Sequence, residues 1–176
     1  MGKYVAFLRG INVGGKGIIK MDDLRAALER AGLKSVHTYV NSGNVILDFD
    51  VSDRGLLESR IETVIADTLG YKTRALVRSK EDIERTVAHF PKVFDDPNWK
   101  HNIIFLSDKI NSPALLDNYQ LRSDIEANSY FDGVIYWSAR LDSGTRAIMY
   151  KLSRAPEYQE MTVRSIGTVK KVLSMM

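Results

Sequence analysis

The order of strand-like and helix-like patterns limits the fold of this 176-residue chain more than any other feature. In the first half, a nearly continuous apolar run over residues 3–8 is typical of a strand that is covered on both faces. A helical pattern follows over residues 22–31, and then two alternating runs joined by a turn over 36–49. A second helical pattern over 53–69 and a last strand-like run over 73–78 complete the half. The predicted order of this half is therefore βαββαβ.

The second half repeats that order. Apolar residues 102–106 predict its first strand, and Ser112-Pro113 predicts a helix start, because proline is favoured at the first helical position. Asp132-Gly133 between two apolar runs is a strong signal for a two-residue hairpin turn. A helical pattern over 145–155, a short strand over 161–164 and a closing helix complete the half, the last with apolar residues at Val169, Val172, Leu173 and Met176.

Two βαββαβ units predict an α+β protein with two tandem ferredoxin-like halves, each a mainly antiparallel sheet with helices on one side. The predicted divisions are a first unit over 1–79, a connecting helix and linker over 80–100, and a second unit with the C-terminal helix over 101–176. A capping box at 79–82 begins the connecting helix, and Pro91 ends it. The duplication rests on the shared order of elements.

Composition excludes several kinds of chemistry. The chain has no cysteine, which excludes disulfides, thiolate nucleophiles and cysteine-ligated metals. No apolar run reaches the ~7–15 residues of a signal-peptide core or the ~18 of a membrane span, so we expect a cytoplasmic protein with no membrane partner. The three histidines lack metal-site spacing, and no metal is expected. No common catalytic motif is present, and the sequence assigns no catalytic residue, cofactor or oligomeric state.

The strongest local signal is a glycine-rich basic loop directly after the first strand, Arg9-Gly10-Ile11-Asn12-Val13-Gly14-Gly15-Lys16-Gly17. It matches most of the phosphate-binding loop pattern, in which backbone N–H groups and a lysine hold phosphate oxygens. Gly17 stands where that pattern has the Ser or Thr that holds magnesium, which disfavours a nucleotide triphosphatase. Glycines also serve tight turns without a ligand. The hypothesis is that an anion is bound by residues of this loop, namely Arg9, Asn12, Gly14, Gly15 and Lys16.

Two further segments are candidates for the same site. Asn41-Ser42-Gly43-Asn44 is first of all a hairpin turn, whose polar groups would orient a ligand if the turn faces the glycine loop. From Arg146 to the end there are six Lys or Arg against two Glu, and Lys151 and Arg164 are the candidates there. Arg164 is expected just before a helix N-terminus, where an anion is favoured.

The net charge of +3 is mild, which favours an anionic small molecule as the ligand, including one that bears a phosphate. One alternative is a nucleic-acid-binding module that uses the same charges together with Tyr136 and Trp137. Another is a protein-interaction domain without a ligand.

These motifs resemble those of the bacterial domain-of-unknown-function family 1697. The resemblance is carried by the loop at 9–16, by Met21 with Leu24-Arg25, and by Thr38-Tyr39-Val40-Asn41-Ser42-Gly43-Asn44-Val45. The family's Thr-x-Arg-Asn-Trp-Asn-Thr-Val corresponds to 162–169, where Ser165-Ile166-Gly167 replace Asn-Trp-Asn, and its Ser-Lys-Leu element is Tyr150-Lys151-Leu152 here. The resemblance implies a duplicated ferredoxin-like fold in a bacterial, cytosolic protein and assigns no activity.

Overall fold

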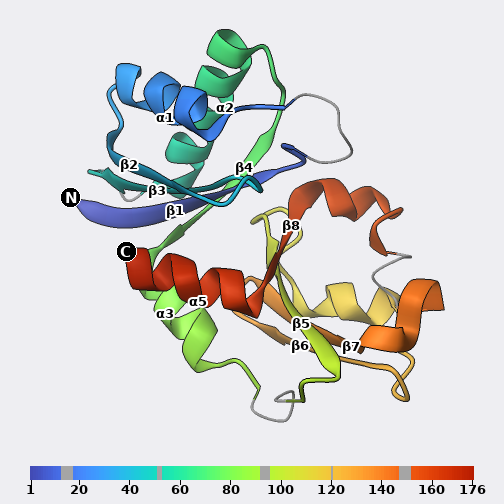
Figure 1. The fold of residues 1–176 in the computed structure, drawn as a ribbon. Helices are drawn as coiled ribbons and strands as arrows, with labels where there is room; N and C mark the ends of the chain where they lie inside the picture. The colour runs from blue at the N-terminus through green and yellow to red at the C-terminus, as the bar shows by residue number, and fades with distance from the viewer. Residues whose placement is uncertain (13–17, 51–52, 92–95, 120, 147–151) are drawn as a thin grey trace. The chain divides into compact units, whose positions relative to one another are not determined.

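The computed structural model describes residues 1–12, 18–50, 53–91, 96–119, 121–146 and 152–176 (Figure 1). The chain divides into two compact units, Met1–Glu84 with Lys171–Met176, and Arg85–Lys170. Each unit holds a four-stranded antiparallel sheet, and the helix α5 (Ile166–Met175) ends the chain. The predicted α+β class is confirmed, whereas the predicted divisions after residues 79 and 100 stay a prediction.

The first unit has the predicted order of elements. They are β1 (Gly2–Arg9), α1 (Met21–Arg30), β2 (Lys34–Tyr39), β3 (Asn44–Phe49), α2 (Arg54–Leu69) and β4 (Arg74–Ser79). The strands lie in the order β2-β3-β1-β4, and each neighbouring pair is antiparallel. Both helices pack on one face of this sheet (Figure 1).

The strand β1 is buried on both faces, as its continuous apolar run predicts. The side chains of residues 5–8 are at most 1% exposed. Ala6 and Leu8 belong to the core between the sheet and its helices, to which α2 contributes Leu57, Ile61 and Ile65. Because the end of β1 is buried in this core, the position at which the chain leaves the strand is fixed.

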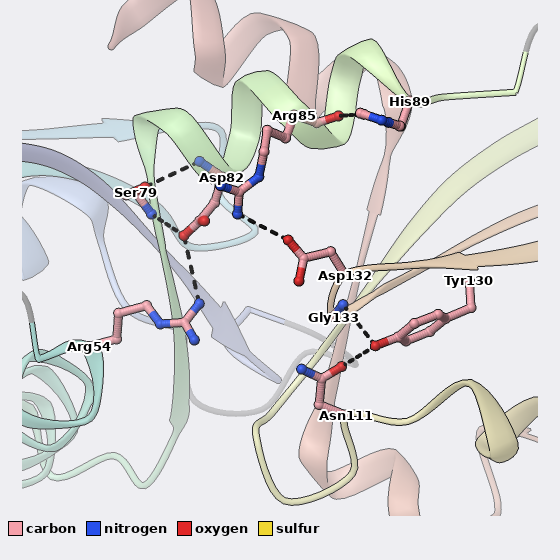
Figure 2. A network of polar contacts seen from close by, with 9 residues as sticks. All are labelled: Arg54, Ser79, Asp82, Arg85, His89, Asn111, Tyr130, Asp132 and Gly133. Atoms are coloured by element: carbon pink, nitrogen blue, oxygen red, sulfur yellow. Dashed lines mark hydrogen bonds and ion pairs between the residues drawn. The ribbon is translucent and has the colours of Figure 1, made fainter.

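Side-chain caps begin two of the helices, α2 and α3 (Lys80–Ala88), whereas Lys20 before α1 makes no side-chain cap hydrogen bond. Asp53 accepts a backbone N–H at the start of α2. The predicted capping box before α3 is confirmed, since the backbone N–H of Ser79 donates to Asp82 Oδ2 (3.0 Å) and that of Asp82 to Ser79 Oγ (3.2 Å). Figure 2 shows this box with Arg54, whose guanidinium lies 3.6 Å from the same carboxylate. Each cap replaces a hydrogen bond that the first turn of a helix lacks.

Helix α2 also covers the edge of the first sheet. The strand β4 lies at that edge, where outward backbone N–H groups have no strand to pair with. Glu62 Oε1 accepts from Ala75 N (2.9 Å), and Glu58 Oε1 accepts from Val77 N (2.8 Å). Two carboxylates one helical turn apart therefore satisfy two alternate amides of the strand.

The second unit has a sheet with the corresponding strand order, β6-β7-β5-β8. Its described elements are β5 (Trp99–Leu106), η2 (Pro113–Asn118), β6 (Glu126–Phe131), β7 (Val134–Arg140), η3 (Leu141–Arg146), η4 (Pro156–Glu160) and β8 (Met161–Ser165). The expected α-helix after Ser112 is instead the short 3₁₀-helix η2. Ser112 does cap it, but Asp117-Asn118 follow within two turns and propagate a helix poorly. The helix expected over 145–155 falls largely on residues 147–151, outside the described residues.

The hairpin predicted at Asp132-Gly133 is confirmed. Both residues have positive φ, 39° and 84°, as a two-residue turn between antiparallel strands requires. Figure 2 shows how the turn is held: Tyr130 accepts from the Gly133 N–H (3.3 Å) and donates to Asn111 Oδ1 (2.7 Å). Arg85 forms an ion pair with Asp132 (3.0 Å).

Candidate functional site

The base of the glycine loop is tied to the turn between β2 and β3 by one side chain. Asn12 Nδ2 donates to the carbonyl oxygens of Ile19 and Asn41, each at 2.9 Å. Asn12 Oδ1 accepts from the Ile19 N–H at 2.7 Å. Asn12 is thus joined to Ile19 and to the first residue of the 41–44 turn.

Gly43 allows this close approach. Its φ is 75°, and a Cβ at this position would lie 2.5 Å from Ile11 Cδ1 and 2.8 Å from Leu8 Cβ. The Leu8 N–H donates to the Gly43 carbonyl at 2.7 Å. Only glycine fits both the left-handed backbone and the contact.

The polar groups of the turn make internal contacts. Asn44 is fully buried, and its Nδ2 donates to the Tyr39 carbonyl (2.9 Å) and to Ser42 Oγ (3.2 Å). These bonds shape the turn. A direct contact of residues 41–44 with a ligand stays a prediction.

A pocket of about 590 Å³ opens beside the first residues of the loop. Three segments of the first unit line it: Arg9 and Gly10 at the end of β1, Glu62, Thr63 and Ala66 of α2, and residues 71–74, which lead into β4. This volume lies in the range of about 300–1,000 Å³ that small-molecule sites occupy. We call it the Arg9–Arg74 pocket.

The charges in this pocket are mostly positive. Arg9 and Arg74 are directly opposite each other on the paired strands β1 and β4, an arrangement of like charges that destabilises a sheet. Lys72 adds a third cation. Glu62 is the one acid among the described residues that line the pocket, and its Oε1 lies 3.8 Å from Arg74 Nε. Cations therefore outnumber carboxylates three to one among the described residues that line the pocket.

Two hydroxyl groups hold the wall of the pocket in place. Tyr71 donates its hydroxyl hydrogen to the Gly10 carbonyl (2.7 Å), and Thr73 donates to the Arg9 carbonyl (2.8 Å). Both bonds join the end of β1 to the segment before β4. The arginines therefore project from backbone that is already ordered, which limits the entropy lost on binding a ligand.

Arg164 lies in β8 of the second unit, immediately before the cap of α5, as predicted. It is 8% exposed, and its Nη1 donates to Thr162 Oγ1 (2.9 Å) and to the Val163 carbonyl (2.8 Å). Burial lowers the pKa of Arg164 to about 10, so the guanidinium stays charged at neutral pH. Gly14, Gly15, Lys16 and Lys151 lie outside the described residues, and their convergence with Arg164 stays a prediction.

The aromatic residues of the nucleic-acid alternative are buried. Tyr136 is 1% exposed and Trp137 is 6% exposed. The hydroxyl of Tyr136 donates to the Thr86 carbonyl at 2.7 Å, and burial raises its pKa. Neither ring offers a face on which a base could stack.

Sequence reasoning missed Glu62, Lys72 and Arg74. A signal for Arg74 was present, because the start of the fourth strand lies beside the end of the first when the two pair antiparallel.

Sequence reasoning also missed a repeated tripeptide, Val77-Arg78-Ser79 and Val163-Arg164-Ser165. In both copies the arginine is buried and donates to the preceding valine carbonyl at 2.8 Å, and the serine Oγ accepts the first-turn N–H of a helix at 3.2 Å.

Comparison with known proteins agrees with the resemblance seen in the motifs. The model of a family described as "Protein of unknown function (DUF1697)" matches residues 1–136, and the chain belongs to this family. Among curated proteins, none matches it.

Two solved structures are similar to the chain. One is the conserved bacterial protein SP0830 from Streptococcus pneumoniae, with 26% sequence identity and a TM-score of 0.84 over 99% of this chain and 98% of that one. The other is an unknown protein from Galdieria sulphuraria, with 13% identity and a TM-score of 0.27 over 93% of this chain and 96% of that one. None of the helices in the described part of the chain is long and apolar enough to span a membrane.

Proposed function

We propose that this protein binds a phosphate-bearing small molecule in the Arg9–Arg74 pocket. The observation that carries the proposal is the pair of arginines opposite each other on β1 and β4, beside Lys72 and at the wall of a pocket of about 590 Å³. Guanidinium groups match the geometry of phosphate oxygens and bind them through two hydrogen bonds at a time. An anion between Arg9 and Arg74 would also relieve their mutual repulsion.

We include the glycine loop in the proposed site because its first two residues, Arg9 and Gly10, line the pocket. Asn12 fixes the base of the loop through its hydrogen bonds with Ile19. We propose that Gly14, Gly15 and Lys16 add backbone amides and a further charge to the bound anion. Whether Lys151 and Arg164 contribute countercharge is tested separately, by Lys151→Ala and Arg164→Ala variants.

Isothermal titration calorimetry and thermal shift test the proposal with inorganic phosphate, nucleotides, sugar phosphates and phosphorylated cofactors. A ligand at about 100 times its Kd should stabilise the protein by about 2.7 kcal/mol. The Arg9→Gln, Arg74→Gln double variant should bind at least about tenfold more weakly, since a hydrogen bond to a charged group contributes about 1.5–3 kcal/mol.

The matched control is Arg25→Gln with Arg30→Gln, which removes the same charge from exposed positions of α1 and should bind normally. Equal weakening in both double variants would mean that net charge, and not the pocket, attracts anions. Absence of any phosphate-dependent shift would contradict the proposal. Binding of single-stranded nucleic acid that falls steeply with salt would favour the alternative ligand class. A cytoplasmic location remains part of the proposal.

We also propose that the two units are copies of one ferredoxin-like unit. The sheets have corresponding strand orders, and the Val-Arg-Ser tripeptide occupies the same position in β4 and β8. Phe7-Leu8 and Phe105-Leu106 correspond as well, because Leu8 N donates to the Gly43 carbonyl and Leu106 N to the Gly133 carbonyl.

This correspondence supports a single anion site in the chain. Ser107 donates its N–H to the Glu160 carbonyl at 2.9 Å, which aligns this pair with Arg9 and Arg74 of the first unit. The second unit therefore has a hydroxyl and a carboxylate where the first has two guanidinium groups. Such a pair would not attract a phosphate.

A further inference from the structure

We infer that the ligand of the Arg9–Arg74 pocket is a phosphomonoester with a neutral, hydroxyl-rich body, which is the chemistry of a sugar phosphate. This inference rests on the proposed function and adds the class of ligand. It follows from the charge of the pocket, its size and the position of Glu62.

The charge of the pocket favours an anionic ligand group. The described residues that line it carry three cations and one carboxylate. A phosphomonoester carries about −1.5 to −2 at pH 7, so this excess of cations attracts it. A triphosphate is longer and would place some of its negative charge against Glu62.

The size of the pocket requires more than a phosphoryl group. About 590 Å³ is a volume typical of sites for whole small molecules. Besides the charged groups, Ala66 and the ring of Tyr71 line it. The body of the ligand therefore meets both apolar and polar surface, as the faces and edges of a sugar do.

Glu62 favours a ligand body that carries hydrogen-bond donors. Its Oε1 accepts from the Ala75 N–H at 2.9 Å and lies 3.8 Å from Arg74 Nε, whereas its Oε2 has no hydrogen-bond partner among the described residues. A carboxylate oxygen only accepts hydrogen bonds, so the matching ligand group is a donor. A hydroxyl meets this need without charge, whereas an ammonium group would be repelled by Arg74.

A Glu62→Gln variant distinguishes the binding of the phosphoryl group from the binding of the rest of the ligand. The new side chain can still accept from the Ala75 N–H through its amide oxygen, and it presents an NH₂ donor in place of Oε2. We expect affinity for sugar phosphates to fall about tenfold, because a charged acceptor is lost. Affinity for inorganic phosphate should rise, because a negative charge leaves the pocket.

The experiment is calorimetry of four anions, namely inorganic phosphate, glycerol 3-phosphate, ribose 5-phosphate and glucose 6-phosphate. The matched control is Glu58→Gln, which alters the equivalent carboxylate one turn earlier, where it accepts from Val77 N (2.8 Å) and does not line the pocket. The control should leave all four affinities unchanged.

Each outcome supports or overturns the inference. At least one of the three hydroxyl-bearing esters should bind more tightly than inorganic phosphate, and Glu62→Gln should reverse that order. If all four anions bind alike and Glu62→Gln tightens every one, the inference is wrong while the proposed function stands. If none binds, or the Arg9→Gln, Arg74→Gln variant binds them normally, both are wrong. If Glu58→Gln lowers the affinity for the esters as much as Glu62→Gln does, then Glu62 affects binding only because it holds the edge of β4, and the inference is overturned.

Discussion

At the scale of single residues, the same side-chain types serve structure or binding according to what surrounds them. Asn12 was a candidate ligand contact, and in the structure its amide makes three hydrogen bonds that close the base of the loop. Arg164 was a candidate for an anion, and it is buried in a strand. Arg9, in contrast, lies at the wall of an open pocket. The surroundings of each side chain in the fold distinguish these positions, and they cannot be read from the motif alone.

Gly43→Ala tests the close contact under the turn. The substitution adds a Cβ 2.5 Å from Ile11 Cδ1 at a φ of 75°, so it combines backbone strain with a clash. We expect a loss of about 3 kcal/mol in the free energy of unfolding, measured by urea denaturation. Gly70→Ala is the control, because its φ is 64° with no atom within 4 Å of the new Cβ, and it should cost about 1 kcal/mol. Equal losses would show that the clash is relieved at no cost.

The ionisation of Asp48 should make the free energy of unfolding depend on pH in the acid range. A hydrogen bond from Ser35, followed by the bond and charge of Lys3, lowers the pKa of Asp48 below its ordinary value of 3.8. Because the pKa is lower in the folded state, this stabilisation is fully present above pH 3.8 and is lost as the pH falls through the folded-state value. In urea titrations from pH 6 to pH 2.5, Asp48→Asn should flatten the acid limb. An unchanged limb would contradict this role.

At the scale of elements, local patterns predicted most of the fold. The apolar run of β1, the capping box before α3 and the Asp132-Gly133 turn depend on residues that are close in sequence, and all three are confirmed. The 3₁₀-helix η2 differs from the predicted α-helix, because the start signal at Ser112 is strong but Asp117 and Asn118 propagate a helix poorly.

Local motifs account for only part of the pocket. Arg9 and Gly10 belong to a local motif, but Arg74 and Glu62 join them through strand pairing and helix packing over more than fifty residues. No local pattern marks such a meeting. The βαββαβ order implied the pairing of the first and fourth strands, yet the partner of Arg9 depends on the register, which side-chain burial decides.

The carboxylates that cover the edge of β4 offer a prediction at this scale. Glu58→Leu removes the acceptor of the Val77 N–H, whereas Glu58→Gln keeps one. Because Val77 is fully buried, an unpaired amide there should cost about 1–3 kcal/mol. Urea denaturation should therefore find Glu58→Leu less stable than Glu58→Gln by about 2 kcal/mol. Equal stability would mean that water replaces the carboxylate at this edge.

At the scale of the whole molecule, two units with corresponding strand orders differ in the residues at the equivalent strand ends. The first has Arg9 and Arg74, and the second has Ser107 and Glu160. We therefore expect calorimetry to find one phosphomonoester bound per chain, with no second site. A stoichiometry of two would mean that the second unit binds anions through groups other than the corresponding pair.

The most direct test of the account is a crystal structure of the protein soaked with the tightest-binding phosphomonoester. We predict density for its phosphoryl group between Arg9 and Arg74, with oxygens within hydrogen-bonding distance of both guanidinium groups, and a hydroxyl of the ligand on Glu62. An empty Arg9–Arg74 pocket in crystals that hold the ligand elsewhere would contradict it.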